Sequence, residues 1–340
     1  MMKNDRLRMV DGAGGEAMDS LIRELILSTL SLRSAGSVGL DDLDDGATVS
    51  VGGEEIVFTI DAHTVKPVFF PGGDIGRLAI SGTVNDLAVM GARPVAIALS
   101  LIIQDGFMRE DLRRIMESVD RTSREVPVAV ITGDTKVVEE DIGIYAITAG
   151  IGIAEHVVRD STAKTGDAIL INGGIGEHGF AVLSKREGME FESDIVSDVA
   201  PVWDVVHNVA KEIGWENIHA MKDPTRGGLS EALNEIAMKS NIGILIHEEQ
   251  VPIKHSVKMA GEMLGISPFS VANEGKVVMA IPRDLAEDAL KAMRRSEYGK
   301  HAAIIGEVLD EYRGHVVLET EVGGKRFLER PLGDPVPRVC

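Results

Sequence analysis

Short apolar runs rich in Val and Ile alternate with amphipathic segments along almost the whole chain. This alternation predicts strands over 55–61, 94–103, 128–132, 143–153, 168–171, 276–281, 302–308, 315–322 and 325–329. Helical spacing predicts helices over 15–33, 74–91, 109–125, 202–213, 229–238 and 284–295. Because the two kinds of element alternate, the fold class is α/β or α+β.

The length of the chain predicts more than one domain. At 340 residues the chain exceeds what a single ordinary core supports. The first half carries carboxylates at predicted strand ends, and the second half carries glycine-rich turns between strands and helices. We therefore expect an N-terminal segment over 1–40, domains over 41–158 and 159–330, and a tail over 331–340.

The charge balance excludes two classes of partner. Thirty-five Lys and Arg against 54 Asp and Glu give a net charge of −19. Such a protein is a poor binder of nucleic acid or of an anionic membrane. No apolar run is long enough to span a bilayer, and the first residues lack the core of a signal peptide. With a single cysteine in addition, we expect a cytoplasmic protein.

Four aspartates stand where strands or loops end, namely Asp45, Asp61, Asp86 and Asp134. Mg²⁺ prefers oxygen ligands, and it commonly binds carboxylates together with nucleotide phosphates. If the four side chains converge, they are suited to hold Mg²⁺ against a triphosphate. Each aspartate alone fits a turn or a helix cap equally well.

Other charged residues stand beside predicted turns. Arg226, in the loop 222–228, is suited to a phosphate or carboxylate, although a structural turn explains it equally well. Lys136 follows a predicted turn over 133–135 and is a candidate to meet a phosphate. Glu274, in the loop before a strand, is a candidate general base. His178, in the glycine-rich turn 173–179, is a candidate either for a phosphate contact or for a hydrogen bond at the helix turn, and we expect the second.

The only cysteine, Cys340, is the last residue. Prolines at 331, 335 and 337 favour extended backbone before it. One cysteine cannot form an internal disulfide, so this thiol is either incidental or a reactive group on a semi-rigid arm.

Together these motifs resemble the HypE family of hydrogenase maturation proteins. The resemblance rests on Asp-Gly-Ala-Gly-Gly15, Asp-Asp-Gly-Ala47, Val-Asn-Asp-Leu-Ala-Val-Met-Gly-Ala92, Gly-Asp-Thr-Lys-Val-Val138, Asp-Pro-Thr-Arg-Gly-Gly228, Asn-Glu-Gly-Lys276 and Pro-Arg-Val-Cys340. It runs from about residue 10 to the end. The middle motifs are shared with aminoimidazole ribonucleotide synthetase, selenophosphate synthetase and thiamine-monophosphate kinase, whereas the ending is specific to HypE. Asp11 departs from the His that many relatives carry there.

The resemblance implies a two-domain PurM-like ATP-binding fold with a flexible C-terminal tail, whose N-terminal halves pair in a homodimer. It implies ATP and Mg²⁺ as cofactors. Carried over by motif, the metal and phosphate positions are Asp45, Asp61, Asp86 and Asp134, and their neighbours at the nucleotide are Asp44, Gly46, Asn85 and Thr135.

The activity implied is ATP-dependent dehydration of a carbamoyl group on Cys340 to a thiocyanate. A HypF-type carbamoyltransferase would load the thiol, and a HypC–HypD complex would receive the cyanide ligand for the iron of [NiFe]-hydrogenase. Within this chemistry Lys136 is the candidate cation at the transferring phosphate and Glu274 the candidate base. Arg226 would hold phosphate or guide the tail, which would leave and enter the site.

Two alternatives remain at this point. The chain is a small-molecule kinase of the same superfamily, in which Cys340 has no role. Otherwise it is an ATP-regulated docking protein whose tail binds a partner without covalent chemistry. Covalent change at Cys340 distinguishes both from a dehydratase.

Overall fold

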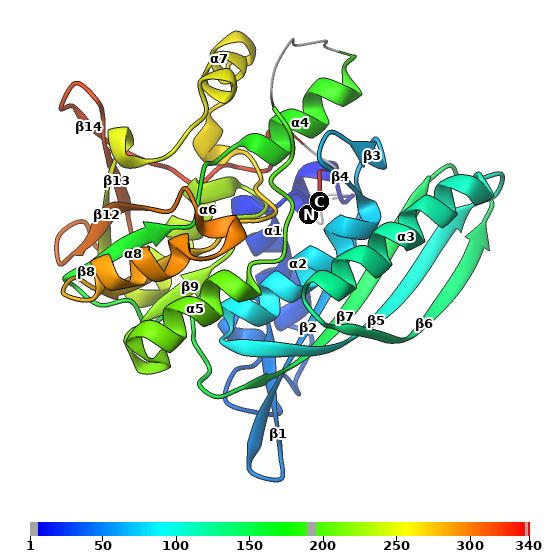
Figure 1. The fold of residues 1–340 in the computed structure, drawn as a ribbon, viewed down its shortest axis with the longest axis horizontal. Helices are drawn as coiled ribbons and strands as arrows, with labels where there is room; N and C mark the ends of the chain where they lie inside the picture. Colours follow the sequence, from blue (N-terminus) through cyan, green and yellow to red (C-terminus); the bar gives the residue numbers. More distant parts are fainter. Residues whose placement is uncertain (1–5, 189–194, 337–338) are drawn as a thin grey trace, which may run out of the picture.

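The computed structural model describes residues 6–188, 195–336 and 339–340. A five-stranded sheet lies in the first half of the chain and a seven-stranded sheet in the second (Figure 1). Helices follow strands in both halves. The mixed α/β class predicted from the alternating pattern is thereby confirmed.

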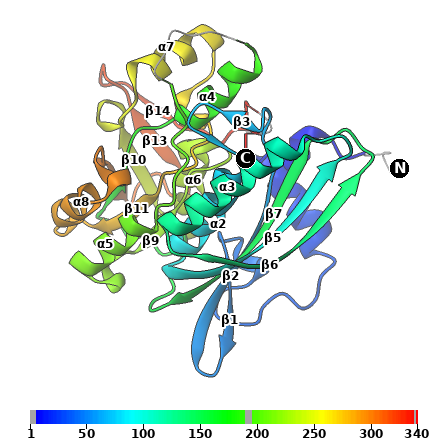
Figure 2. The ribbon, with the colours of Figure 1, turned by 45° about the vertical axis from the view of Figure 1, so that its right-hand side comes forward.

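The first sheet has the strand order β1-β2-β7-β5-β6. Its strands are β1 (Ala47–Val51), β2 (Glu54–His63), β5 (Ala92–Gln104), β6 (Ala129–Val138) and β7 (Ile144–Ala154). Helices α2 (Ile75–Val89) and α3 (Arg109–Glu125) cover one face of this sheet (Figure 2). The opposite face leaves apolar side chains exposed, among them Phe58, Ile60, Val95, Ile151 and Ile153.

The two helices on the first sheet begin and end where local chemistry dictates. Asp74 caps α2, because its Oδ1 accepts hydrogen bonds from the backbone N–H groups of Gly76 and Arg77 at 2.8 and 3.1 Å. Helix α3 is amphipathic and buries Ile115 and Val119 against the sheet side. Its observed bounds match the predicted range 109–125.

The second sheet has the order β14-β13-β10-β12-β8-β11-β9. The strands are β8 (Asp167–Ile171), β9 (Ala220–Lys222), β10 (Gly243–His247), β11 (Val278–Pro282), β12 (Ala303–Leu309), β13 (Val316–Glu319) and β14 (Lys325–Phe327). The helices of this half are α4 (Glu177–Arg186), α5 (Trp203–Ile213), α6 (Gly228–Ser240), α7 (His255–Leu264) and α8 (Ala286–Arg294).

Both faces of the second sheet are buried, which explains its continuous apolar strands. On β8, Leu170 packs in one apolar cluster with residues of α5 and α8. Ile169 and Ile171 point the other way, into a cluster with residues of α6. The side chains alternate because successive residues of a strand face opposite sides.

Short elements complete the chain. Helix α1 (Gly15–Leu21) continues into a π-helical segment, η2 (Ile22–Leu27), and β3 (Phe69–Phe70) pairs with β4 (Gly73–Asp74). Single 3₁₀ turns occupy η1 (Met9–Gly12), η3 (Leu40–Asp42), η4 (Trp215–Asn217), η5 (Glu248–Gln250), η6 (Pro268–Ser270) and η7 (Glu297–Gly299). The predicted helix 15–33 therefore ends early, and α7, β1, β9 and β10 were not predicted.

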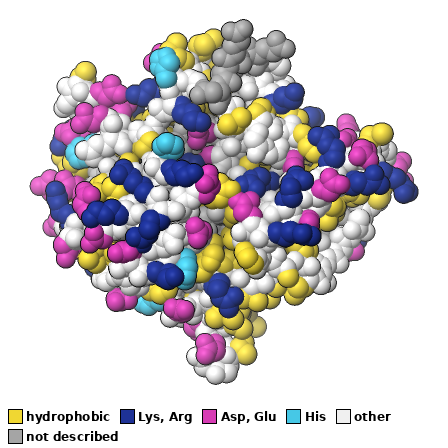
Figure 3. All heavy atoms as spheres, viewed as in Figure 1, with side chains coloured by type: hydrophobic (Ala, Val, Ile, Leu, Met, Phe, Trp, Pro, Cys, Tyr) yellow, Lys and Arg dark blue, Asp and Glu magenta, His cyan; other side chains and the backbone are white. Residues whose placement is uncertain are grey.

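The surface agrees with a folded protein of mixed charge. On the face drawn in Figure 3, Lys and Arg side chains are interspersed with Asp and Glu, so the acidic excess does not form a single patch there. Within the described ranges, none of the helices has the length and apolar character that crossing a bilayer requires.

Candidate active site

A cavity of about 830 Å³ lies between residues of the two halves. Its charged lining comes from segments far apart in the chain. The acidic members include Asp44, Asp45, Asp61, Asp86, Asp223 and Glu274, the basic members include Lys222, Arg226, Lys239 and Arg330, and Cys340 also lines it. The cavity thus gathers carboxylates, cations and the terminal thiol.

Strand β2 and helix α2 supply the first wall. Along β2, Thr59, Asp61 and His63 share the face that turns toward α2, because alternate residues of a strand point the same way. On α2, Gly82 and Asp86 are four residues apart and so lie on one side of the helix. A Cβ at Gly82 would come within 2.8 Å of the His63 ring, so glycine permits this close approach.

Thr59 links Asp86 to the loop before β1. Its hydroxyl is the donor to two acceptors, Asp86 Oδ2 at 2.7 Å and the backbone oxygen of Asp45 at 2.9 Å. Burial, followed by the charges of Asp61 and Asp223, raises the pKa of Asp86 well above its ordinary value, although the hydrogen bond from Thr59 opposes this shift.

Lys222 is the central cation of the cavity. Its Nζ lies 2.6 Å from Asp45 Oδ1, 2.9 Å from Glu235 and 3.5 Å from Asp160. Burial by itself lowers the pKa of Lys222, but these carboxylates reverse that effect and keep the amine charged. Lys222 therefore ties the second sheet to the loop before β1.

The pKa of the Asp44 carboxyl group lies near neutral pH. Burial, with the charges of Asp160 and Asp45, raises the pKa of Asp44 to about 7. A carboxyl group in this state gains its charge readily when a cation arrives. The neighbouring Gly46 lines the same cavity.

The far wall holds Asp223, Arg226 and Glu274. Glu274 is buried, and its backbone is fixed by Asp198, which accepts from its N–H at 3.1 Å, and by Asn85, which donates to its carbonyl at 3.2 Å. Burial, followed by the charges of Asp223 and Asp198, raises the pKa of Glu274 well above its ordinary value. Arg226 is a close neighbour of Cys340, and its charge opposes the rise that burial causes in the pKa of the Cys340 thiol.

The tail is docked, with Cys340 in the cavity. Val336 and Val339 are buried in the core of the first domain. A terminal carboxylate oxygen of Cys340 accepts from the N–H of Thr64 at 3.2 Å, and the backbone carbonyl of Val339 accepts from His178 Nε2 at 2.6 Å. Burial raises the pKa of the Cys340 thiol well above its ordinary value despite Arg226, so the docked sulfur is protonated.

The donor set fits a hard divalent cation. Asp45 Oδ2, Asp223 Oδ2 and Glu274 Oε1 are buried oxygens that find no hydrogen-bond partner among the residues that the structure describes. Unpaired buried carboxylate oxygens are costly, and an oxygen-seeking cation would satisfy them. In the described residues no three His, Cys, Asp or Glu side chains are close enough together to hold a metal ion in this conformation. The ligands would therefore have to close on the ion.

Some predicted site residues are not at the cavity. Asn85 is buried at the domain interface, where it donates to the carbonyls of Ala200 and Glu274 and accepts from the N–H of Val202. The structure thus gives Asn85 the role of positioning the loop that carries Glu274. It does not line the cavity.

Asp134, Thr135 and Lys136 also lie outside the cavity within this chain. The predicted turn over 133–135 is wrong, because these residues continue β6, whose register pairs Ser100 with Asp134. Buried Leu99 marks the helix-covered face, so Asp134 and Lys136 point to the exposed face. Their side chains are 63% and 69% exposed and lie 3.7 Å apart.

Sequence reasoning missed several residues of the site. Lys222 ends strand β9 and Asp223 directly follows it, and a carboxylate at a strand end is the signal that identified Asp61. In the loop 222–228 the sequence indicated only Arg226 as a contact for a phosphate or carboxylate. Asp160, Glu235 and His63 carried no distinguishing signal, because their importance depends on the partners that the fold brings to them.

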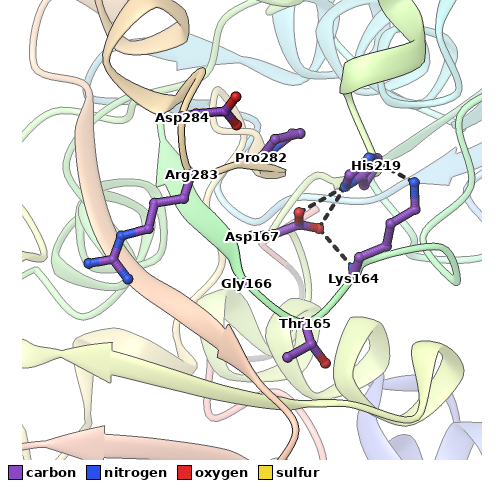
Figure 4. Close-up of a pocket in the computed structure, with 8 residues that line it drawn as sticks. All are labelled: Lys164, Thr165, Gly166, Asp167, His219, Pro282, Arg283 and Asp284. Carbon is purple, nitrogen blue, oxygen red and sulfur yellow. Dashed lines mark hydrogen bonds and ion pairs between the residues drawn. The ribbon is translucent and has the colours of Figure 1, made fainter.

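A second hollow lies where β8 begins, around Gly166 and Asp167 (Figure 4). There His219 Nδ1 lies 2.8 Å from Asp167 Oδ1, and His219 Nε2 lies 2.9 Å from Lys164 Nζ. The three groups are each other's partners, which is sufficient to explain them. We assign this hollow no part in the reaction.

Comparison with known proteins places these features in context. The model of the AIR synthase related protein N-terminal domain matches residues 43–154, and the corresponding C-terminal domain model matches 164–319. A putative hydrogenase expression/formation protein of Methanocaldococcus jannaschii is 53% identical over 98% of this chain and 100% of that protein. Carbamoyl dehydratase HypE of Azotobacter vinelandii is 41% identical over 100% of this chain and 98% of that protein.

Solved structures are similar over most of the chain. A chain of a HypE–HypF complex has a TM-score of 0.85 and 43% identity, and the match covers 92% of this chain and 100% of that chain. HypE in complex with ATP has a TM-score of 0.81 and 38% identity, with 98% of this chain and 100% of that chain covered. The two-domain architecture is therefore shared along nearly the full length.

Proposed function

The chain belongs to the HypE family of carbamoyl dehydratases, and on that premise we propose that it dehydrates a carbamoyl group carried on its own Cys340. The product is a protein-bound thiocyanate, which supplies cyanide ligands for the iron of [NiFe]-hydrogenase. One observation carries this proposal: the only cysteine of the chain lines the same cavity as Arg226, Glu274 and the acidic cluster.

ATP is the co-substrate in this proposal, in keeping with the similarity to a HypE structure in complex with ATP. Asp45, Asp61 and Asp86 would hold Mg²⁺, which when bound neutralises phosphate charge. Asp44 and Gly46 would lie against the nucleotide. Asp45 Oδ2 supports this assignment, since it has no hydrogen-bond partner within the described ranges, and Asp223 is a further candidate ligand because the same holds for its Oδ2.

The reaction begins at the oxygen of the thiocarboxamide S–C(=O)–NH₂. Transfer of the γ-phosphoryl group to that oxygen forms an O–P bond and releases ADP. The C–O bond then breaks with phosphate as the leaving group, both protons leave the nitrogen, and S–C≡N remains. Glu274 is the proposed base. Its pKa is raised, so its ionised form accepts a proton more strongly than an ordinary carboxylate does. Arg226 would hold the phosphate or guide the tail.

Asp134 and Lys136 fit this scheme across a dimer, whereas Thr135 is paired with buried Leu101 and so lies on the other face of the sheet. The face of the first sheet that carries Asp134 and Lys136 also carries exposed Phe58 and Ile60. An exposed apolar sheet face is a natural interface, and we propose that two such faces pair in a homodimer. Lys136 of each copy would then act at a phosphate site near that interface.

The tail has to serve more than one site. Cys340 is half-buried in the docked tail and the pKa of its thiol is raised there, so we propose that loading takes place with the tail outside the cavity. We propose that the predicted tail 331–340, of which residues 337 and 338 lie outside the described part of the chain, leaves and enters the cavity relative to the domains 41–158 and 159–330. Outside the cavity the thiol would meet a HypF-type carbamoyltransferase, in line with the similarity to a HypE–HypF complex, and later a HypC–HypD scaffold.

Intact-mass measurement tests the function directly. The chain is incubated with a HypF-type enzyme, carbamoyl phosphate and Mg-ATP. We expect a mass gain of one carbamoyl group in place of the thiol hydrogen, followed by loss of one water. Cys340→Ser should show neither change. An unchanged mass of the wild-type chain would favour a docking protein or a kinase.

A further inference from the structure

We infer that His178 is a positioning residue that grips the docked tail by the backbone carbonyl of Val339, whatever group the sulfur of Cys340 carries. The inference rests on the proposed function, because it concerns how the carrier tail is held. His178 lies on α4 and does not line the cavity, so its part differs from that of the groups facing the phosphates.

The hydrogen bonds around His178 fix one tautomer. A carbonyl oxygen only accepts, so the 2.6 Å contact to Val339 requires the hydrogen on Nε2. Nδ1 must then accept from the Ser197 hydroxyl, 2.7 Å away. The Ser197 oxygen in turn accepts from the N–H of Val199 at 3.1 Å. In this series of three hydrogen bonds each donor therefore meets an acceptor.

The ring is also enclosed by its surroundings, which favour its neutral form. His178 is fully buried, and burial lowers its pKa, which favours the neutral imidazole that this network needs. The Phe70 ring stands edge-on to it, with the centroids 5.3 Å apart. Helix α4 is anchored in turn to the loop before Glu274, because Asn273 Oδ1 accepts from the N–H of Gly176 at 2.7 Å. The donor is therefore preorganised relative to the proposed base.

A second hydrogen bond, from the other domain, also holds the docked tail. The N–H of Thr64, just beyond β2, donates to a terminal carboxylate oxygen of Cys340 at 3.2 Å. The backbone oxygens of two successive residues are thus held by donors from the two halves of the chain, beside β3 and β4 where the C-terminus lies (Figures 1 and 2). Neither contact uses the sulfur. The grip can therefore accept thiol, thiocarboxamide and thiocyanate alike.

Two substitutions of His178 test the contributions of its two ring nitrogens separately. His178→Gln places an amide nitrogen near Nε2 and can still donate to Val339. His178→Asn keeps a polar atom near Nδ1 for Ser197 but leaves the Val339 carbonyl without its donor. Because Cys340 is the only thiol, its rate of alkylation by iodoacetamide measures how often the tail is undocked.

We expect His178→Asn to alkylate about tenfold faster than wild type, the change that corresponds to about 1.4 kcal/mol in the docking equilibrium. His178→Gln should stay near the wild-type rate. Ser197→Ala, which frees the ring, should lie between them. His219→Asn is the matched control, since His219 is also hydrogen-bonded but lies in the hollow of Figure 4. ATP affinity and melting temperature report on folding.

Equal alkylation rates in wild type, His178→Asn and Ser197→Ala would overturn the inference. The alkylation assay uses unloaded protein, so it stays informative even if no thiocyanate forms. Failure of carbamoylated wild type to lose water with Mg-ATP would instead count against the proposed function. If the wild type does lose water, we expect His178→Asn to do so more slowly and His178→Gln to keep pace.

Discussion

Lys222 and Asp45 form an ion pair of 2.6 Å that joins the end of strand β9 to the loop before strand β1. Lys222 is about nine-tenths buried and Asp45 nearly as much. Breaking a buried pair by removing one partner leaves the other charge without compensation, and this typically costs about 3–5 kcal/mol.

We therefore expect Lys222→Met to lower the free energy of unfolding by roughly that amount, about 3–5 kcal/mol. The measurement is the urea midpoint of the free protein. Lys291→Met is the control, because the Lys291–Asp288 pair lies on an exposed helix face and should leave the midpoint unchanged. Equal midpoints for both variants would mean that the buried pair is not stabilising.

Glu274→Gln keeps the volume of the side chain but removes its basicity. We expect Cys340 to be carbamoylated normally and the dehydration step to slow by about 10²–10⁴-fold, the usual contribution of a general base. Single-turnover intact-mass analysis separates the two steps. Full thiocyanate formation by the variant would remove Glu274 as the base.

The raised pKa of Asp334 predicts that docking of the tail depends on pH. Burial raises the pKa of Asp334 to about 6 in the docked tail, although Arg226 and Arg186 oppose the shift. Because the docked value is the higher one, this contribution to docking is complete below the ordinary pKa of 3.8 and is lost as the pH rises through about 6.

Hydrogen exchange at Val336 and Val339, corrected for intrinsic rates, should show protection that falls over this pH window. Asp334→Asn keeps the acceptor for the N–H of Val336, found at 2.8 Å, but cannot titrate. Its protection should therefore change less with pH. Identical profiles for the two proteins would argue against a role of Asp334.

The exposed face of the first sheet predicts a dimer. Ile60→Asp places a charge on that face, where Ile60 is 66% exposed, and should convert the dimer to monomers in sedimentation velocity. Val322→Asp is the control, because Val322 is 94% exposed in the hairpin between β13 and β14. If Lys136 acts across the interface, ATP turnover should fall together with the dimer. A monomeric wild type would refute the pairing.

Mg²⁺ should stabilise the free protein by satisfying the buried carboxylate oxygens. We expect its melting temperature to rise with Mg²⁺ concentration, as for any ligand that binds only the folded state. Asp86→Asn should weaken this response, while Ca²⁺ serves as a comparison of larger ionic radius. A melting temperature indifferent to Mg²⁺ would contradict the assignment of the acidic cluster as a metal site.

Much of the fold followed from local patterns. Helix α3 begins and ends where amphipathic spacing predicted, and strand β2 ends just beyond the predicted carboxylate Asp61. Periodicity works there because each element buries one face. It failed at β6, where Gly133 and Asp134 suggested a turn although their backbone continues the ladder with β5. Turn-forming residues indicate a preference that strand pairing can override.

The sequence by itself determined the chemistry that the chain carries: one terminal thiol, carboxylates at strand ends and an arginine before a helix. These are properties of single residues and short motifs. Only the tertiary structure decided which of them meet. Asp61, Asp86, Arg226, Glu274 and Cys340 line one cavity because two domains and a docked tail bring distant segments together. Asp134 and Lys136 face away because the side-chain direction in a strand depends on its register.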